Sequence, residues 1–274
     1  MYDTRFALRV LRLTLLPAFI VLFAAVPRDS RAGGTPPPSP GAFAPFLSAG
    51  AVAGFEQGLD AALTPSGTAR SAAAAVRAFV AHLQTGRLDA REEAAVLAHL
   101  DRLQATRPDL SDALAQAATA VRTRTVGKTA PEIAGIDLDG RPLRLTDYRG
   151  KVVVLAFTGD WCGICRSQYP YERLLLDLYR GWPFAIVAVN SDTSIAVARD
   201  ADARSGLTYR SWWDGAPPGQ IASAWGVTGW PTTYVLDTHG VIRYVDLQRE
   251  DLLKAVRELL AEETTTAGAS TPRP

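Results

Sequence analysis

The sequence predicts an α/β fold, a mixed sheet with helices on both faces, preceded by a small all-α region. The stretch 151–158, which is apolar from Val152 to Phe157, and the apolar run at 184–189 are typical of strands that are covered on both faces. Helical spacing follows each run, and a hairpin pattern at 232–246 precedes a closing amphipathic helix. Parallel pairing early and antiparallel pairing late predict a single sheet between two layers of helices.

The N-terminus has the pattern of an export signal. Three arginines precede an apolar run at 13–26, which is shorter than the roughly 20 residues of a membrane span but suits a signal peptide. Ser30 and Ala32 offer small residues to a cleavage enzyme. We therefore predict that 1–32 is a signal peptide or a membrane anchor, with a buried helix as the alternative. The protein is then expected in the periplasm or cell envelope.

A linker and a helical region come next. Residues 33–48 are rich in proline and should stay extended. Residues 49–124 predict three or four helices, with Asp89 and Glu92 as a capping box and Pro108 at the start of a helix. We interpret this region, whose role is unknown, as a spacer or as a docking element for a partner.

From 125 to 262 strands and helices alternate. The expected elements, in chain order, are a hairpin at 133–145 around Asp139-Gly140, a strand at 151–158, a helix at 162–178, a strand at 184–189, a helix at 194–205, a short strand at 209–213, a helical turn at 220–225, a hairpin of 232–236 and 241–246, and a helix at 250–261. Trp212 and Trp213 should point to opposite faces of their strand, so that one is in the core. The tail, 263–274, is expected to be disordered.

Charge and histidine usage exclude several functions. The chain has 29 basic and 28 acidic residues, so a nucleic-acid partner is not expected. Its only cysteines are Cys162 and Cys165, which leaves half a zinc site without a second pair of ligands. His82, His99 and His239 lie in unrelated segments. We expect no metal and no cofactor other than a redox-active disulfide, with an inert structural disulfide as the alternative.

Cys162 and Cys165 lie three positions apart where a buried strand gives way to a helix. A thiol attacks as its thiolate, and an ordinary cysteine is mostly protonated at neutral pH. At the first turn of a helix, unpaired N–H groups and the positive end of the dipole favour the anion. We therefore expect Cys162 to attack a substrate disulfide and Cys165, one turn later, to resolve the mixed disulfide.

These residues belong to a longer pattern that resembles the thioredoxin superfamily, specifically the exported TlpA-like and ResA-like redoxins. The resemblance covers about 127–260. The segments that carry it are 127–131, 145–151, Trp161-Cys162-Gly163-Ile164-Cys165, Pro170 eight residues after Cys162, and 226–233.

The resemblance implies further site residues. Pro231 would be a cis-proline that lies against the disulfide, and Trp230 before it would offer its backbone to an extended substrate segment. Trp161 would cover the active site, with Gly163 and Ile164 between the two cysteines.

The chain departs from the family at the positions that handle protons. The family's buried aspartate on the central strand is replaced by Ala156, and a glutamate found three residues after the second cysteine is replaced by Gln168. Asp160 is interpreted as a solvated loop acid. The proton acceptor for Cys165 is therefore left open, and Trp230 is bulkier than the usual residue before that proline.

The sequence thus predicts an extracytoplasmic thiol-disulfide oxidoreductase. It would exchange the Cys162–Cys165 disulfide with client proteins, as a reductant because no histidine lies between the cysteines, and would draw electrons from a membrane donor. A peroxiredoxin-like peroxidase is an alternative, although Gly159 stands where the peroxidase threonine would precede Cys162. A redoxin-fold adaptor, which binds a partner without redox activity, is the other.

Overall fold

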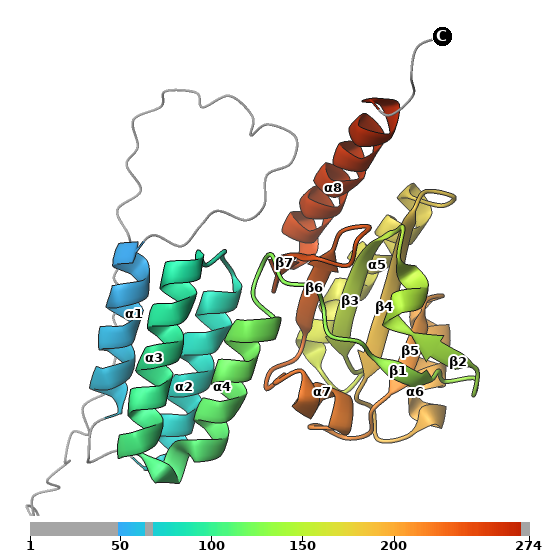
Figure 1. Ribbon diagram of the computed structural model, residues 1–274. Coiled ribbons are helices and arrows are strands. Elements are labelled where there is room, and N and C mark those ends of the chain that lie inside the picture. The colour runs from blue at the N-terminus through green and yellow to red at the C-terminus, as the bar shows by residue number, and fades with distance from the viewer. Residues whose placement is uncertain (1–48, 64–67, 270–274) are drawn as a thin grey trace, which may run out of the picture. The chain divides into compact units, whose positions relative to one another are not determined.

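The computed structural model describes residues 49–63 and 68–269 (Figure 1). The predicted leader and proline-rich linker lie outside the described residues. Among the helices described, none has the length and apolar character needed to cross a membrane.

The helical region contains four α-helices with a core of their own. They are α1 (Ala49–Ala62), α2 (Ala69–Gln84), α3 (Ala90–Thr106) and α4 (Ser111–Thr123). The capping box is present, since Asp89 Oδ1 accepts from Glu92 N and Glu92 Oε2 accepts from Asp89 N, each at 2.8 Å. Pro108 begins a 3₁₀ turn, so the last helix starts at Ser111 rather than at Pro108. Apolar residues on the facing sides of these helices form one cluster.

The second part is built on a five-stranded sheet of order β5-β4-β3-β6-β7. Its strands are β3 (Val152–Thr158), β4 (Phe184–Asn190), β5 (Arg210–Trp213), β6 (Thr232–Leu236) and β7 (Ile242–Val245). The first three are parallel and the last two antiparallel. The helices are α5 (Gly163–Leu178), α6 (Ile195–Ser205), α7 (Gln220–Ala224) and α8 (Arg249–Ala269). This is the predicted α/β arrangement with a mixed sheet.

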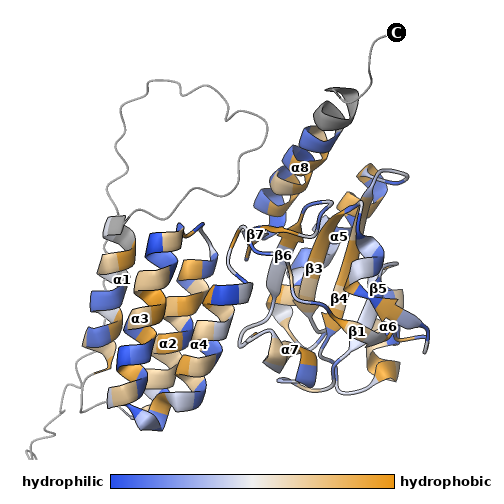
Figure 2. Cartoon of the chain, viewed as in Figure 1, coloured by the Kyte–Doolittle hydropathy of each residue, from blue (hydrophilic) through white to orange (hydrophobic). Residues whose placement is uncertain are grey.

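The central strand β3 separates two cores. Every residue of β3 is buried, and Figure 2 shows β3 and β4 as hydrophobic along their length. Val152 and Val154 face the cluster that includes residues of α5 and α8. Leu155 and Phe157 face the other cluster, which includes Trp212 and residues of α7. This two-sided burial holds the end of β3, and the loop after it, in one place.

A short hairpin lies outside the main sheet. Its strands, β1 (Ala134–Ile136) and β2 (Pro142–Arg144), pair only with each other, apart from a bridge between Asp137 and Trp212. Trp212 is buried and its Nε1 donates to the Leu143 carbonyl at 3.1 Å, whereas Trp213 is exposed. The prediction that only one of the two tryptophans is in the core is confirmed.

The prediction of a disordered tail from residue 263 is wrong for its first part, because α8 continues to Ala269. Contacts from distant residues hold these turns. Glu262 pairs with Arg243 at 2.9 Å, and Glu263 accepts a hydrogen bond from Thr238 Oγ1 at 2.7 Å. Residues 270–274 lie outside the described part.

Truncation of Leu155 should destabilise the fold strongly. Its side chain is fully buried at the centre of β3, so Leu155→Ala leaves a cavity and should lower the free energy of unfolding by about 2–5 kcal/mol. Leu174→Ala, which removes the same atoms from an exposed position of α5, should cost about 0.5 kcal/mol or less. Urea unfolding followed by tryptophan fluorescence measures both. Equal losses in the two variants would contradict this account of the core.

Candidate active site

Cys162 occupies the N-cap of α5. Its backbone is extended, and its Sγ accepts a hydrogen bond from the backbone N–H of Cys165 at 3.2 Å. A side chain at this position faces the unpaired N–H groups and the positive end of the helix dipole, both of which stabilise an anion. The structure therefore places the Cys162 sulfur where the sequence predicted it.

The two thiols differ in burial. Both cysteines are free, with Cys162 8% and Cys165 1% exposed. Burial raises the pKa of Cys165 to about 12, helped by its contact with Cys162 and opposed by the hydroxyl of Thr158 and the backbone of Gly159. Cys165 is therefore held as a protonated thiol at neutral pH, and Cys162 is the sulfur that a substrate reaches first.

The segment before β6 lies against Cys162. The Trp230–Pro231 peptide bond is cis, as the resemblance implied. The thiol of Cys162 donates to the carbonyl oxygen of Trp230 at 3.4 Å. Trp230 and Pro231 thus lie beside the sulfur, where an extended substrate would have to pass.

Two indole rings form a wall beside the sulfur. Trp161 and Trp230 pack with their ring centroids 5.8 Å apart, and both indole N–H groups bond to Ser191, one to its carbonyl and one to its hydroxyl. A Cβ at position 159 would come within 2.4 Å of Trp161 Nε1, so Gly159 is needed for this packing. Trp161 is half exposed, and Gly163 and Ile164 are exposed on the same loop-helix junction. Sequence reasoning missed Ser191, which only its position at the end of β4 could have indicated.

The two positions that depart from the family carry no acid near Cys165. Ala156 is buried in the middle of β3. Gln168 is buried on α5, where its Oε1 accepts a hydrogen bond from Arg249 N at 2.9 Å. Its Nε2 has no hydrogen-bond partner in the described structure. Gln168 therefore anchors the start of α8 and cannot accept a proton.

A buried acid does occur further along α5. Cys165, Tyr169 and Glu172 share the buried face of this helix, and Glu172 is 4% exposed. Tyr209 donates its hydroxyl to Glu172 Oε2 at 2.7 Å. Burial raises the pKa of Glu172 to about 7, although the Tyr209 hydrogen bond acts against it. Sequence reasoning missed this residue, although its spacing of seven from Cys165 places it on the same side of the helix.

Further carboxylates lie between α5 and α6. Burial raises the pKa of Asp202 to about 7, with smaller contributions from Asp192 and Asp160. Asp160 forms an ion pair with Arg204 at 3.0 Å, and its side chain is 22% exposed. The sequence did not indicate this ion pair, because its two residues are far apart in the chain.

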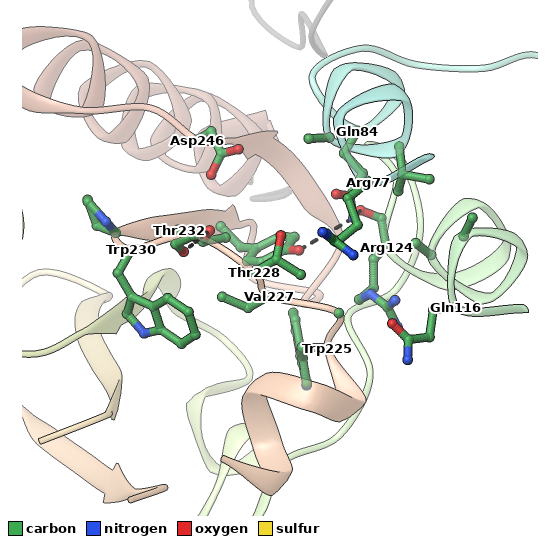
Figure 3. Close-up of a pocket in the computed structure, with 18 of the residues that line it drawn as sticks. Arg77, Gln84, Gln116, Arg124, Trp225, Val227, Thr228, Trp230, Thr232 and Asp246 are labelled. Carbon is green, nitrogen blue, oxygen red and sulfur yellow. Dashed lines mark hydrogen bonds between the residues drawn. The ribbon is translucent and has the colours of Figure 1, made fainter. Parts of the chain in front are cut away.

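A pocket of about 290 Å³ opens beside Pro231 (Figure 3). Helices α2 and α4 line one side, with Arg77, Gln84, Gln116 and Arg124 as the polar groups, and residues 225–232 line the other. Elsewhere in 49–63 and 68–269, no three histidine, cysteine or acidic side chains lie together in a way that could hold a metal ion.

Comparisons with known proteins identify the family of this chain. Residues 126–245 match the AhpC/TSA family. The thiol-disulfide oxidoreductases ResA of Geobacillus thermodenitrificans and Geobacillus kaustophilus are 38% and 36% identical over 131 residues, which is 46% of this chain and 74% of each relative. A solved thioredoxin domain of a thiol-disulfide oxidoreductase from Bacteroides vulgatus aligns with a TM-score of 0.46 and 24% identity, over 50% of this chain and 98% of its own. The extent and identity of the match to the ResA proteins mean that this chain belongs to the ResA-like thiol-disulfide oxidoreductases of the thioredoxin superfamily.

Proposed function

We propose that the protein reduces disulfides of client proteins outside the cytoplasm, with Cys162 and Cys165 as its redox-active pair. One observation carries this proposal. The more accessible sulfur, on Cys162, caps α5 and accepts the N–H of Cys165, whose own thiol is buried and has its pKa raised to about 12. One cysteine is thus placed to attack and the other is held back until a mixed disulfide forms.

The reaction transfers two electrons in two exchanges. The Cys162 thiolate attacks one sulfur of the client disulfide, which forms a mixed disulfide, and the other client sulfur leaves as a thiolate that takes up a proton. Cys165 then gives up its proton and attacks the Cys162 sulfur. The second client sulfur leaves reduced, and a Cys162–Cys165 disulfide remains for a membrane electron donor to reduce.

The exposed residues around Cys162 position the client. Trp161 and Ile164 are half exposed, and Trp230 and Pro231 line the adjacent pocket. An extended segment that passes Trp230 and Pro231 can pair with the backbone there and bring its disulfide to Cys162. Gly163 leaves the helix start uncovered by any side chain of its own.

We assign the uptake of the Cys165 proton to Glu172. The Thr158 hydroxyl contacts both Cys165 and Tyr169, and Tyr169 interacts electrostatically with Cys165 and with Glu172. Cys165, Tyr169 and Glu172 share one buried face of α5, with Thr158 at the end of β3, and we infer that the proton moves along these groups. An acid whose pKa is about 7 can accept a proton and release it again near neutral pH.

The location and the direction of electron flow rest on the sequence. The apolar run at 13–26, with three arginines before it, supports export. The absence of a histidine between the cysteines favours a reductant.

Mixed disulfides should accumulate on Cys162 when Cys165 is removed. The Cys165→Ser protein can make the first exchange but not the second, so clients should stay attached and appear as reductant-sensitive adducts on gels. Cys162→Ser is the matched control and should trap none.

The purified protein without its leader should reduce insulin, which a pure adaptor would not do. A reduction potential near about −120 mV, instead of about −270 mV or below, would identify an oxidant.

Glu172→Gln should remove a pH dependence from the second exchange. The carboxylate that accepts the proton exists above a pKa of about 7, so release of a preformed mixed disulfide should speed up through that pH in the wild type. The variant should be slower by roughly tenfold at pH 8 and should lack the inflection near pH 7. Stopped-flow release of a fluorescent peptide measures this.

The folding stability of Glu172→Gln provides a control, because the substitution should slow release without lowering stability at pH 8. The raised pKa of Glu172 means that its folded-state contribution is present below pH 4.5 and is lost as pH rises through about 7. Glu172→Gln should therefore be at least as stable as the wild type at pH 8. Slow release together with a destabilised fold would indicate a packing role instead.

The first 48 residues should export a reporter. Alkaline phosphatase, which needs disulfides formed outside the cytoplasm, should be active when fused to residues 1–48 and inactive when 13–26 are deleted from the fusion. Substituting the three arginines before residue 13 should reduce export. Equal activity with and without 13–26 would refute the proposed location.

A further inference from the structure

Two arginines with no acidic partner line the pocket beside Pro231. Arg124 follows α4 and is 3% exposed, yet among the residues that the structure describes no carboxylate pairs with it. Its Nη1 donates to the Ala224 carbonyl at 3.1 Å, and its Nε has no hydrogen-bond partner. Arg77, on α2, lines the same pocket and likewise lacks an acidic partner within the described part of the chain.

A buried guanidinium without a counter-ion is unfavourable. Burial lowers the pKa of Arg124, because the surroundings disfavour its charged form. Removing a charge from water costs several kcal/mol unless an opposite charge and hydrogen bonds compensate for it. Arg124 Nη1 donates only to the Ala224 carbonyl and, at 3.5 Å, to the Thr123 hydroxyl, and these two neutral acceptors leave most of that cost in place. The site is therefore incomplete as it stands and suited to an anion.

The positive and negative side chains lie on opposite sides of the pocket. Figure 3 shows Arg77, Arg124 and Gln116 on one side of the pocket and Asp246 and Trp230 on the other. Burial raises the pKa of Asp246, since no cation offsets it there. A ligand would therefore place its negative group at the arginine end, away from Asp246.

We propose that this pocket binds a carboxylate side chain of the client segment whose disulfide reacts at Cys162. The proposal rests on the proposed function and names the class of client that the site prefers. The guanidinium group binds carboxylates through two parallel hydrogen bonds, and Arg124 Nε is one donor still free for such a bond.

The dimensions suit a side chain on a passing peptide. At about 290 Å³ the pocket is at the lower end of small-ligand sites, so it takes one or two side chains. Its lining includes Trp230, whose carbonyl oxygen accepts the hydrogen bond from Cys162 Sγ, and the adjacent Pro231. An extended chain advances about 3.3 Å per residue, so the acidic residue would lie a few positions from the reactive cysteine.

This assignment gives the helical region a role. Arg77 and Gln116 come from α2 and α4, and the redoxin part alone supplies no cation to the pocket lining. The helical region would then select acidic clients for a redox pair that lies in the other part of the chain.

Disulfide-linked peptides test the proposal. Each test peptide has one cysteine, which is joined by a disulfide to a reporter peptide of constant sequence. A single Glu is placed at one position, from four residues before the cysteine to four residues after it. For each Glu peptide there is a matching Gln peptide and a matching Lys peptide. At the best position the full protein without its leader should reduce the Glu peptide with a kcat/KM about tenfold above that of the Gln peptide, which is about 1.4 kcal/mol. Added salt should reduce this preference.

Arginine variants locate the effect. Arg77→Gln, at an exposed position, and Arg124→Gln should each bring the Glu-to-Gln ratio close to one. Arg124→Lys, which keeps the charge, should retain part of it. Arg122→Gln makes the same change at an exposed position of α4 outside the pocket and should leave the ratio unchanged. Thermal unfolding identifies any variant that has lost its fold, and Arg77→Gln tests the proposal even if Arg124→Gln does not fold.

The outcomes separate this inference from the proposed function. Equal reduction of Glu, Gln and Lys peptides at every position would overturn the carboxylate subsite while leaving disulfide reduction intact. Failure to reduce any peptide would instead overturn the proposed function. A dependence on Arg77 seen only with a small aromatic disulfide dicarboxylate, and not with peptides, would show that the pocket does not serve client segments.

Discussion

The hydrogen bond from the backbone N–H of Cys165 to Cys162 Sγ, 3.2 Å long, is the contact on which the site depends. It exists only because β3 is buried on both faces and ends at Thr158, so that Cys162 stands at the N-cap of α5. The same geometry turns Cys165 inward under the first turn. One helix start therefore separates the two thiols into an accessible and a buried one, which is the difference that sequential attack and resolution need.

Because Cys165 is buried, its thiol needs a nearby group that can accept its proton. A thiol with a pKa of about 12 must lose its proton before it can attack, and the central strand offers only Ala156 beneath it. We place the acid on the helix instead, where Glu172 lies on the buried face that also carries Cys165. With the acid on the helix, β3 carries no ionisable residue, and its one polar side chain is Thr158. This placement also explains why Gln168 is free to hold the start of α8.

The sequence pattern predicted those features of the fold that depend on residues close together in the chain. The apolar runs, the Asp89 and Glu92 capping box and the end of the helix at 205, followed by Gly206 with its left-handed backbone, all follow from neighbouring residues, and the structure has them. The end of α8 could not be predicted, because Glu262 and Glu263 are held by residues from the β6–β7 hairpin. Ser191 was missed for the same reason, since its two indole partners are 30 and 39 residues away.

The pocket lined by Arg77 and Arg124 shows most clearly which features could not be predicted from the sequence. In the sequence, Arg124 is one of many basic residues, and it stands near the end of an alanine-rich helix. The helix dipole stabilises a cation at that end, so the residue needs no further explanation. Only the fold reveals that it is 3% exposed and that no acidic side chain in the described part of the chain pairs with it. A side chain that lacks its counter-ion inside a protein departs from ordinary packing, and such departures occur where a ligand completes the site. Under the proposed function, the buried charge near the redox pair is therefore the feature of this chain best suited to select among client disulfides.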